Sequence, residues 1–185
     1  LAPLDDLPGG DPGPVPIAAG QPRQFGAIPV IIRNNTDSAF YDLDISATAR
    51  DAAGSVLGTG SGHDISPSFV PPGGIAFGRV LFGDTPLNGA TIEYLVTGNL
   101  SPRTIFVSRD LEIVEHNLVG GNALDSVKAF VICLDDSLAP TTAQSSSTDQ
   151  DRVEAAAELP FSVDLLGTEA QCGRYLLAAT GNETN

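Results

Sequence analysis

The chain has 185 residues, of which 42% are hydrophobic, which is enough apolar material for one or two packed cores. Its 23 acidic residues outnumber its 9 basic residues and give a net charge of −14. So negative a chain is repelled by phosphate backbones and anionic lipid, which excludes nucleic acid as a partner. No apolar run approaches the roughly 18 residues of a membrane span. The lack of methionine and the start at Leu1 favour a processed, exported chain whose signal segment has been removed.

Residues 1–24 form a leader that is rich in proline and glycine. Prolines at positions 3, 8, 12, 14, 16 and 22 exclude a helix and disfavour a central strand. Two interpretations remain open. The leader is either a flexible, polyproline-like segment, or it lies extended along the sheet edge of another subunit, with Val15 and Ile17 as the candidate assembly contacts.

Residues 25–99 are predicted to form a first all-β unit. The segment DLDISATAR at residues 42–50 alternates, which places Leu43, Ile45, Ala47 and Ala49 on one face of a half-buried strand. A turn at residues 51–54 leads into a second strand at 55–60, so the pair is predicted to be a hairpin. Further strands are expected at residues 25–33, 75–82 and 90–97, with a turn at 34–38.

Two prolines and two glycines at residues 71–74 interrupt the first unit before its next strand. In the strand that follows, Ile75, Phe77, Arg79 and Leu81 share one face. We expect this bulkier face to point into the core of the unit, with Arg79 near an open end.

A weaker copy of the first unit is predicted at residues 111–185, after a short rigid connector at residues 100–110. The same interval along the chain separates Asp51 from Asp135 and Phe77 from Phe161. An almost equal interval separates the pair Gly98-Asn99 from the pair Gly181-Asn182. Three matches at nearly one spacing indicate an internal duplication.

The segments NNT at residues 34–36, DLDISATAR at 42–50, DAAGSVLGTG from Asp51 and SFVPPGGIAF from Ser68 together resemble the FxLYD-type domain. The resemblance covers about residues 28–98 and, less closely, 111–181; of the signature itself, the aspartates Asp51 and Asp135 are kept. Such domains are immunoglobulin-like β-sandwiches of exported bacterial and archaeal proteins. The resemblance implies two tandem sandwiches behind an extended leader, in a non-enzymatic module outside the cell, and it transfers no catalytic residue.

Two kinds of covalent modification are suggested by the sequence. Cys133 and Cys172 are the only cysteines, and an even pair in an exported protein indicates a disulfide, with a buried free thiol as the alternative. The acceptor pattern for N-glycosylation occurs at Asn34, Asn99 and Asn182, all in predicted loops or strand ends, although so short a motif also arises by chance.

No catalytic or metal-binding motif emerges. His63 and His116 are the only histidines, and neither has a nucleophile motif nearby. Glycines at 58, 60 and 62 alternate along a strand and do not form a phosphate-binding loop. Paired aspartates at residues 5–6, 42/44, 135–136 and 149/151 lack the twelve-residue calcium loop. We therefore expect no enzymatic activity, no cofactor and no metal.

Three functional hypotheses follow from these patterns. The first is a structural subunit of an extracellular filament or surface layer, a homopolymer joined through its N-terminal extension. The second is a monomeric cell-surface module that binds glycans or surface proteins, with residues 141–151 as a recognition loop. The third is an accessory domain of a secreted hydrolase.

Overall fold

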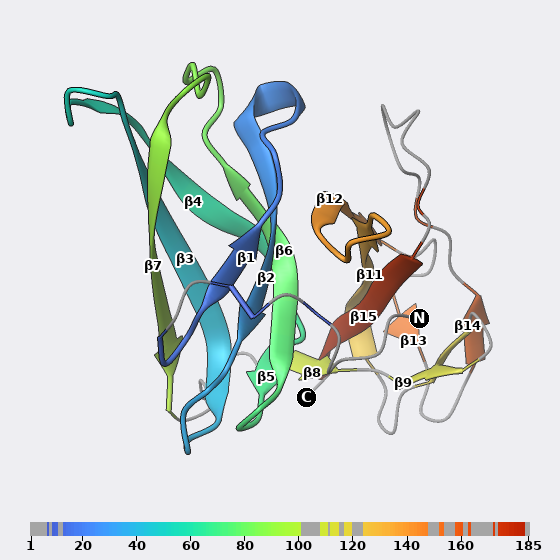
Figure 1. Ribbon diagram of the computed structural model, residues 1–185. Helices are drawn as coiled ribbons and strands as arrows, with labels where there is room; N and C mark the ends of the chain where they lie inside the picture. The colour runs from blue at the N-terminus through green and yellow to red at the C-terminus, as the bar shows by residue number, and fades with distance from the viewer. Residues whose placement is uncertain are drawn as a thin grey trace.

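The computed structural model describes residues 7, 9–10, 13–100, 108–110, 112–114, 117–119, 124–147, 152–153, 158–160, 163, 172 and 174–183. Within these residues the chain is all-β and its sheets are antiparallel, as predicted (Figure 1). The only helical segment described is the three-residue 3₁₀ turn η2 (Gln24–Gly26). No helix in the described part of the chain is long and apolar enough to cross a membrane.

Seven strands form the first sheet: β1 (Ile17–Ala19), β2 (Ala27–Arg33), β3 (Phe40–Arg50), β4 (Val56–Ser66), β5 (Phe69–Val70), β6 (Ile75–Leu81) and β7 (Thr91–Asn99). Their order is β1-β2-β6-β4-β3-β5, and β7 pairs with β3. Strand β4 pairs with β3 through its first half and with β6 through its second half, so it connects two layers. We call β1-β2-β6 the middle layer and β3-β7 the outer layer.

The remaining strands form two smaller sheets. One has the order β12 (Pro140–Ser147), β11 (Leu124–Leu134), β15 (Arg174–Glu183), β8 (Ser108–Asp110), with β13 (Arg152–Val153) also paired to β11. The other has the order β14 (Glu158–Pro160), β10 (Asn117–Val119), β9 (Glu112–Val114). Residues 108–110 were expected in the connector but extend the second sheet as β8; residues 101–107 of the predicted connector, and Phe161, lie outside the described residues.

We call strands β1 to β7 the first unit and strands β8 to β15 the second unit. The two units share a pattern of strand register. Strands β3 and β11 each have 11 residues, and their first residues are separated by the same interval as Asp51 and Asp135. Arg50 pairs with Val56 and Thr91, and its counterpart Leu134 pairs with Pro140 and Arg174. Both strands also carry a positive φ at the matching position, 48° at Asp42 and 52° at Ser126. These elements therefore repeat at the interval that the sequence matches indicate.

The hairpin turns that follow β3 and β11 are also alike. Asp51 Oδ1 accepts hydrogen bonds from the N–H groups of Ala53 and Ser55 at 2.9 and 2.8 Å. Asp135 Oδ1 accepts from the N–H groups at the same two offsets, those of Ser137 and Ala139, at 2.9 and 3.0 Å. An additional hydrogen bond from the Ser137 hydroxyl, together with that from the Ala139 N–H, lowers the pKa of Asp135. The aspartate side chain in each turn therefore accepts hydrogen bonds from two backbone N–H groups of the turn, in place of backbone carbonyl acceptors.

The outer faces of the two units differ in polarity, and this difference decides how the units pack. In the first unit, Ser46 and Thr48 of β3 lie on the face turned away from the core, where β7 places Glu93. The positions that correspond in the second unit hold Phe130, Ile132 and Leu176, which are buried. Because burial of apolar surface is favourable, the second sheet packs this face against the middle layer of the first unit.

Two apolar clusters result from this arrangement. The first core fills the space between the outer and middle layers and consists of Ile28, Val30, Ile32, Leu43, Ile45, Ala47, Ala49, Val70, Ala76, Val80, Phe82 and Leu87. The inter-unit core joins the middle layer to the second sheet and consists of Leu7, Ala18, Ile31, Ile75, Phe77, Phe130, Ile132, Leu134, Leu138, Ala143, Leu176 and Ala178. The middle layer is thus buried on both faces.

This double burial corrects one expectation about β6. Phe77 was predicted to point into the core of its own unit, but it lies in the inter-unit core. The smaller face of the strand, with Ala76 and Val80, fills the first core instead. Arg79 is not at an open end, since it lies between the units. The prediction was wrong because it assumed a sheet with one solvent face, whereas β6 has none.

The described part of the leader pairs with its own chain, which corresponds neither to a flexible segment nor to an intersubunit strand, the two interpretations left open by the sequence. β1 is antiparallel to β2, with Ile17 opposite Ile32, and Gly20 donates a hydrogen bond to the Pro29 carbonyl at 2.8 Å. Val15 and Ile17 pack against the first core, while Ala18 points into the inter-unit core. The leader thus covers the edge of β2, so the backbone groups of that edge are satisfied within one molecule.

Candidate functional site

The best-defined polar cluster lies between the two units, at the edge of the inter-unit core. Arg79 of β6 donates to Asp64 Oδ2 of β4 at 2.8 Å and to Gln144 Oε1 of β12 at 3.0 Å. Ser145 of β12 donates its hydroxyl to the same Asp64 oxygen at 2.8 Å. We call these four residues the Asp64 joint. They connect strands of both units through charge-assisted hydrogen bonds.

A β-bulge in β4 brings Asp64 to this position. The register between β4 and β6 shifts between His63 and Ser66, and Asp64 has a φ of 55°. Gly78 lies opposite the bulge, where an added Cβ would come within 2.6 Å of the Asp64 carbonyl oxygen. The glycine thus allows the two backbones to approach closely enough for Asp64 to reach Arg79.

The geometry of the Asp64 joint is that of a closed contact. Phe77, Phe130 and Ala143 lie around it, and the gap between these side chains has no room for a water molecule. Arg79 Nε is buried and has no hydrogen-bond partner among the residues that the structure describes. Ser145 donates its proton to a carboxylate that is already paired with a guanidinium, so the serine is not activated as a nucleophile. The cluster can hold two sheets in register, and it offers no space for a substrate.

Neutralising Asp64 is expected to destabilise the fold. Asp64→Asn leaves the partly buried Arg79 without its counter-charge, which should lower the free energy of unfolding by about 1–3 kcal/mol. The measurement is urea denaturation followed by circular dichroism. Glu93→Gln is the matched control, because Glu93 pairs with Arg50 in the solvent and should lose less than about 0.5 kcal/mol. Equal losses in the two variants would contradict a structural role for the joint.

The structure corrects the prediction of a glycosylation site at Asn34. This side chain is fully buried, and its Nδ2 donates to the carbonyls of Ser38, Val70 and Pro71 at 2.8, 3.1 and 3.2 Å. Its Oδ1 accepts from Thr36 N–H at 3.0 Å. The amide that a glycan would modify is thus used to fasten the 34–38 turn to β5. The predicted turn is present, and the same residues that form the acceptor pattern form it.

The other two glycosylation candidates occupy corresponding ends of the two units. Asn99 closes β7 and is half-buried, whereas Asn182 lies near the end of β15 and is exposed. In the register of the two sheets they are equivalent positions, opposite Tyr41 and Asp125. Neither side chain is enclosed as Asn34 is.

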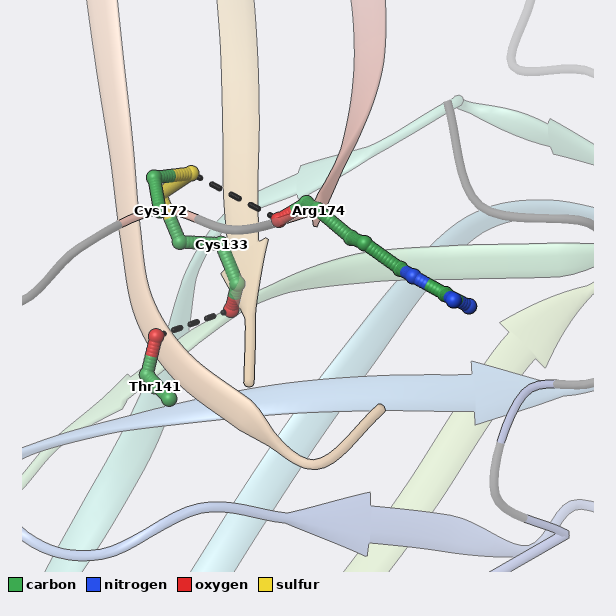
Figure 2. The surroundings of a disulfide bond; sticks show 4 residues. All are labelled: Cys133, Thr141, Cys172 and Arg174. Carbon is green, nitrogen blue, oxygen red and sulfur yellow. Dashed lines mark hydrogen bonds between the residues drawn. A yellow bond between two sulfur atoms is a disulfide. The ribbon is translucent and has the colours of Figure 1, made fainter. Parts of the chain in front are cut away.

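The predicted disulfide between Cys133 and Cys172 is confirmed, with a Cα–Cα separation of 5.1 Å (Figure 2). Cys133 lies near the end of β11, buried on the face opposite the inter-unit core. Thr141 of β12 donates its hydroxyl to the Cys133 carbonyl at 3.2 Å, and Cys172 Sγ lies 3.5 Å from the Arg174 carbonyl (Figure 2). The bridge ties the segment that precedes β15 to the central strand of the second sheet.

Within the described residues, the paired aspartates and His63 do not gather into one site. No three His, Cys, Asp or Glu side chains are grouped to hold a metal ion within the described residues. Asp135 uses Oδ1 in its turn, and Asp44 lies exposed on β3. His63 is exposed and pairs with Arg79 across the sheet, while His116 and the aspartates at 5–6, 149 and 151 lie outside the described residues.

Sequence reasoning missed the Asp64 joint. The residues 141–151 were predicted to be a recognition loop or surface edge, but residues 140–147 form β12 and lie over β2 and β6. Nothing in the polar sequence around Gln144 and Ser145 indicates that these side chains face another sheet. A bulge is also hard to recognise in β4, because its glycines interrupt the alternation of apolar and polar side chains that would show a change of register.

Tyr94 of β7 has a perturbed ionisation that can be tested. Burial raises the pKa of Tyr94 to about 12. The folded state therefore keeps a proton that the unfolded chain loses near pH 10, so stability should fall as the pH rises from about 10 towards 12. In a spectrophotometric titration of phenolate, Tyr94→Phe should remove the ionisation step near pH 12. An unchanged high-pH limb in the variant would contradict the assignment.

Comparison with known proteins does not place the chain in a family. A scan against protein-family models found no match, and a search of curated proteins found no similar sequence.

Proposed function

We propose that this chain is a non-enzymatic structural subunit of an extracellular assembly, such as a filament or surface layer. The observation that carries the proposal is the inter-unit core, which includes Phe77 from the first unit and Ile132 from the second. A shared core of this kind holds the two units together as one rigid body. Rigidity of this kind is more suitable for a load-bearing subunit than for a receptor with a hinge between its domains. The Asp64 joint adds directional contacts across the same interface.

An exported location forms part of the proposal. Disulfides persist in oxidising compartments, and the Cys133–Cys172 bridge supports such a location. The net charge of −14 suits a chain that must stay dispersed before it assembles. Asn99 and Asn182 remain the glycan acceptor candidates, and the resemblance to FxLYD-type domains, with two tandem immunoglobulin-like sandwiches, belongs to the same proposal.

A monomeric cell-surface binding module is the second candidate. It is favoured by the leader, since Val15 and Ile17 are used within their own chain and are not offered to a neighbour. If the chain assembles, the contact must therefore lie elsewhere on its surface or require release of β1. Glycans or surface proteins would be the ligands of such a module.

Sedimentation velocity across a wide range of protein concentrations, combined with negative-stain electron microscopy, tests the proposal. A structural subunit should form particles larger than a dimer, and should show no turnover in a broad hydrolase screen. A particle that stays monomeric at every concentration and binds a glycan or protein saturably would replace the proposal with the second candidate. Turnover would overturn both.

A further inference from the structure

The outer edge of β7 is open in the part of the chain that the structure describes. β7 pairs with β3 along one side, from Thr91 to Asn99, and no described strand pairs with its other side. Figure 1 shows β7 at the margin of the first unit, on the side away from the second unit. The strand contains no proline or lysine that would block pairing. A strand of this length with one unpaired row of N–H and C=O groups is a template for another strand.

The second unit shows how the corresponding edge is filled. β15 is the counterpart of β7, and its outer edge pairs antiparallel with β8 at Thr180, Gly181 and Asn182. These positions correspond to residues 97–99 of β7. One repeat interval before β8, the chain forms the η2 turn Gln24–Gly26, which is not a strand. The sheet therefore accepts an antiparallel strand at this edge, and the first unit supplies none from its described residues.

We infer that this edge binds β7 of a second copy of the chain, antiparallel about a two-fold axis through Leu95. This register uses the whole strand, because Leu95 is its central residue. It places the two Leu95 side chains opposite each other on the outer face. The remaining opposed pairs are Glu93 with Thr97, Tyr94 with Val96, Ile92 with Gly98, and Thr91 with Asn99.

The side chains of β7 suit this register. Leu95 is 62% exposed and is the large apolar side chain on an otherwise polar stretch of the outer face. Tyr94 and Val96, both half-buried, would continue the first core across the contact. Centring the pair on Glu93 would oppose two carboxylates, whereas centring it on Leu95 sets each one against a threonine. Cross-strand apolar pairs stabilise a sheet, and like charges directly opposite destabilise it.

This inference rests on the proposed function in one respect, because it names one contact of the assembly. A two-fold contact closes at a dimer, so a filament or layer needs a second contact. Each copy carries a net charge of −14, so repulsion opposes the dimer at low ionic strength. Raising the salt concentration towards about 0.15 M should therefore strengthen it.

The first test compares Leu95→Lys with the wild-type chain in sedimentation velocity. Two ammonium groups would replace two apolar side chains at the centre of the contact, which should weaken the dimer by at least about tenfold. Val56→Lys is the matched control, because Val56 is 55% exposed, belongs to the same sheet and changes the net charge equally. Equal weakening by both variants, or by neither, would overturn the inference.

The second test reads the register directly. Leu95→Cys should form a cross-linked dimer on mild oxidation, whereas Val56→Cys should not, with peptide mapping to verify that the native disulfide is intact. A mixture of Glu93→Cys and Thr97→Cys chains should cross-link with each other, because these positions are opposed. Self-linking of Glu93→Cys at the same rate would overturn the register.

The outcomes separate the inference from the proposed function. Assembly that stops at a dimer and is lost in Leu95→Lys would support the β7 contact and overturn the structural subunit. Larger particles that persist unchanged in Leu95→Lys would support the subunit and overturn the β7 contact.

Discussion

Replacing Phe77 by alanine is expected to lower the free energy of unfolding by about 3–5 kcal/mol. Phe77 is 3% exposed and lies in the inter-unit core, between the middle layer and the second sheet. Removing the ring takes apolar contacts from both units and leaves a cavity that β6 and β11 cannot close without moving a sheet. Urea denaturation followed by circular dichroism measures the loss.

Phe25→Ala is the control for this prediction, because the Phe25 ring is 69% exposed and its removal should change stability by less than about 0.5 kcal/mol. Because the inter-unit core is shared, the wild-type chain should also unfold in a single transition. If Phe77→Ala cost as little as Phe25→Ala, the two units would not share a core.

Removing the disulfide is expected to cost about 4 kcal/mol. The Cys133–Cys172 bridge closes a loop with a sequence separation of 39 residues. Such a cross-link lowers the conformational entropy of the unfolded chain. Its loss raises that entropy and so stabilises the unfolded state by roughly 4 kcal/mol. The double variant Cys133→Ala, Cys172→Ala should therefore show a lower urea midpoint than the oxidised wild-type chain.

A reductant provides the control for the disulfide prediction. It should lower the midpoint of the wild-type chain to near that of the double variant and leave the variant unchanged. Because Cys133 is buried, alanine also removes a sulfur atom from the interior. A reduced wild-type chain as stable as the oxidised chain would show that the bridge does not constrain the unfolded state.

Local pattern in the sequence predicted local structure well. The alternation at residues 42–50 predicted the inner face of β3, and Leu43, Ile45, Ala47 and Ala49 are all buried. The hairpin after Asp51 was also predicted correctly, because an aspartate side chain can close such a turn from within the turn. The even cysteine count predicted the disulfide.

Long-range contacts could not be predicted in the same way. The run of buried residues from Ala129 to Leu134 has no alternation, because both faces of β11 are covered, so the sequence does not show which face meets the other unit. The Asp64 joint depends on a bulge and on a strand that is distant in sequence. For Val15 and Ile17, the apolar pattern is the same whether the edge belongs to the same chain or to another.

The middle layer has a consequence for the fate of truncated chains. A fragment ending at Asn99 would turn Ile31, Ile75 and Phe77 from interior residues into a water-facing patch, and a fragment starting at Leu124 would do the same to Phe130 and Ile132. Each fragment alone would therefore expose an apolar patch that promotes association with other molecules. Proteolysis within residues 101–107 would therefore leave two pieces that remain associated, so a nicked molecule should survive as a noncovalent pair.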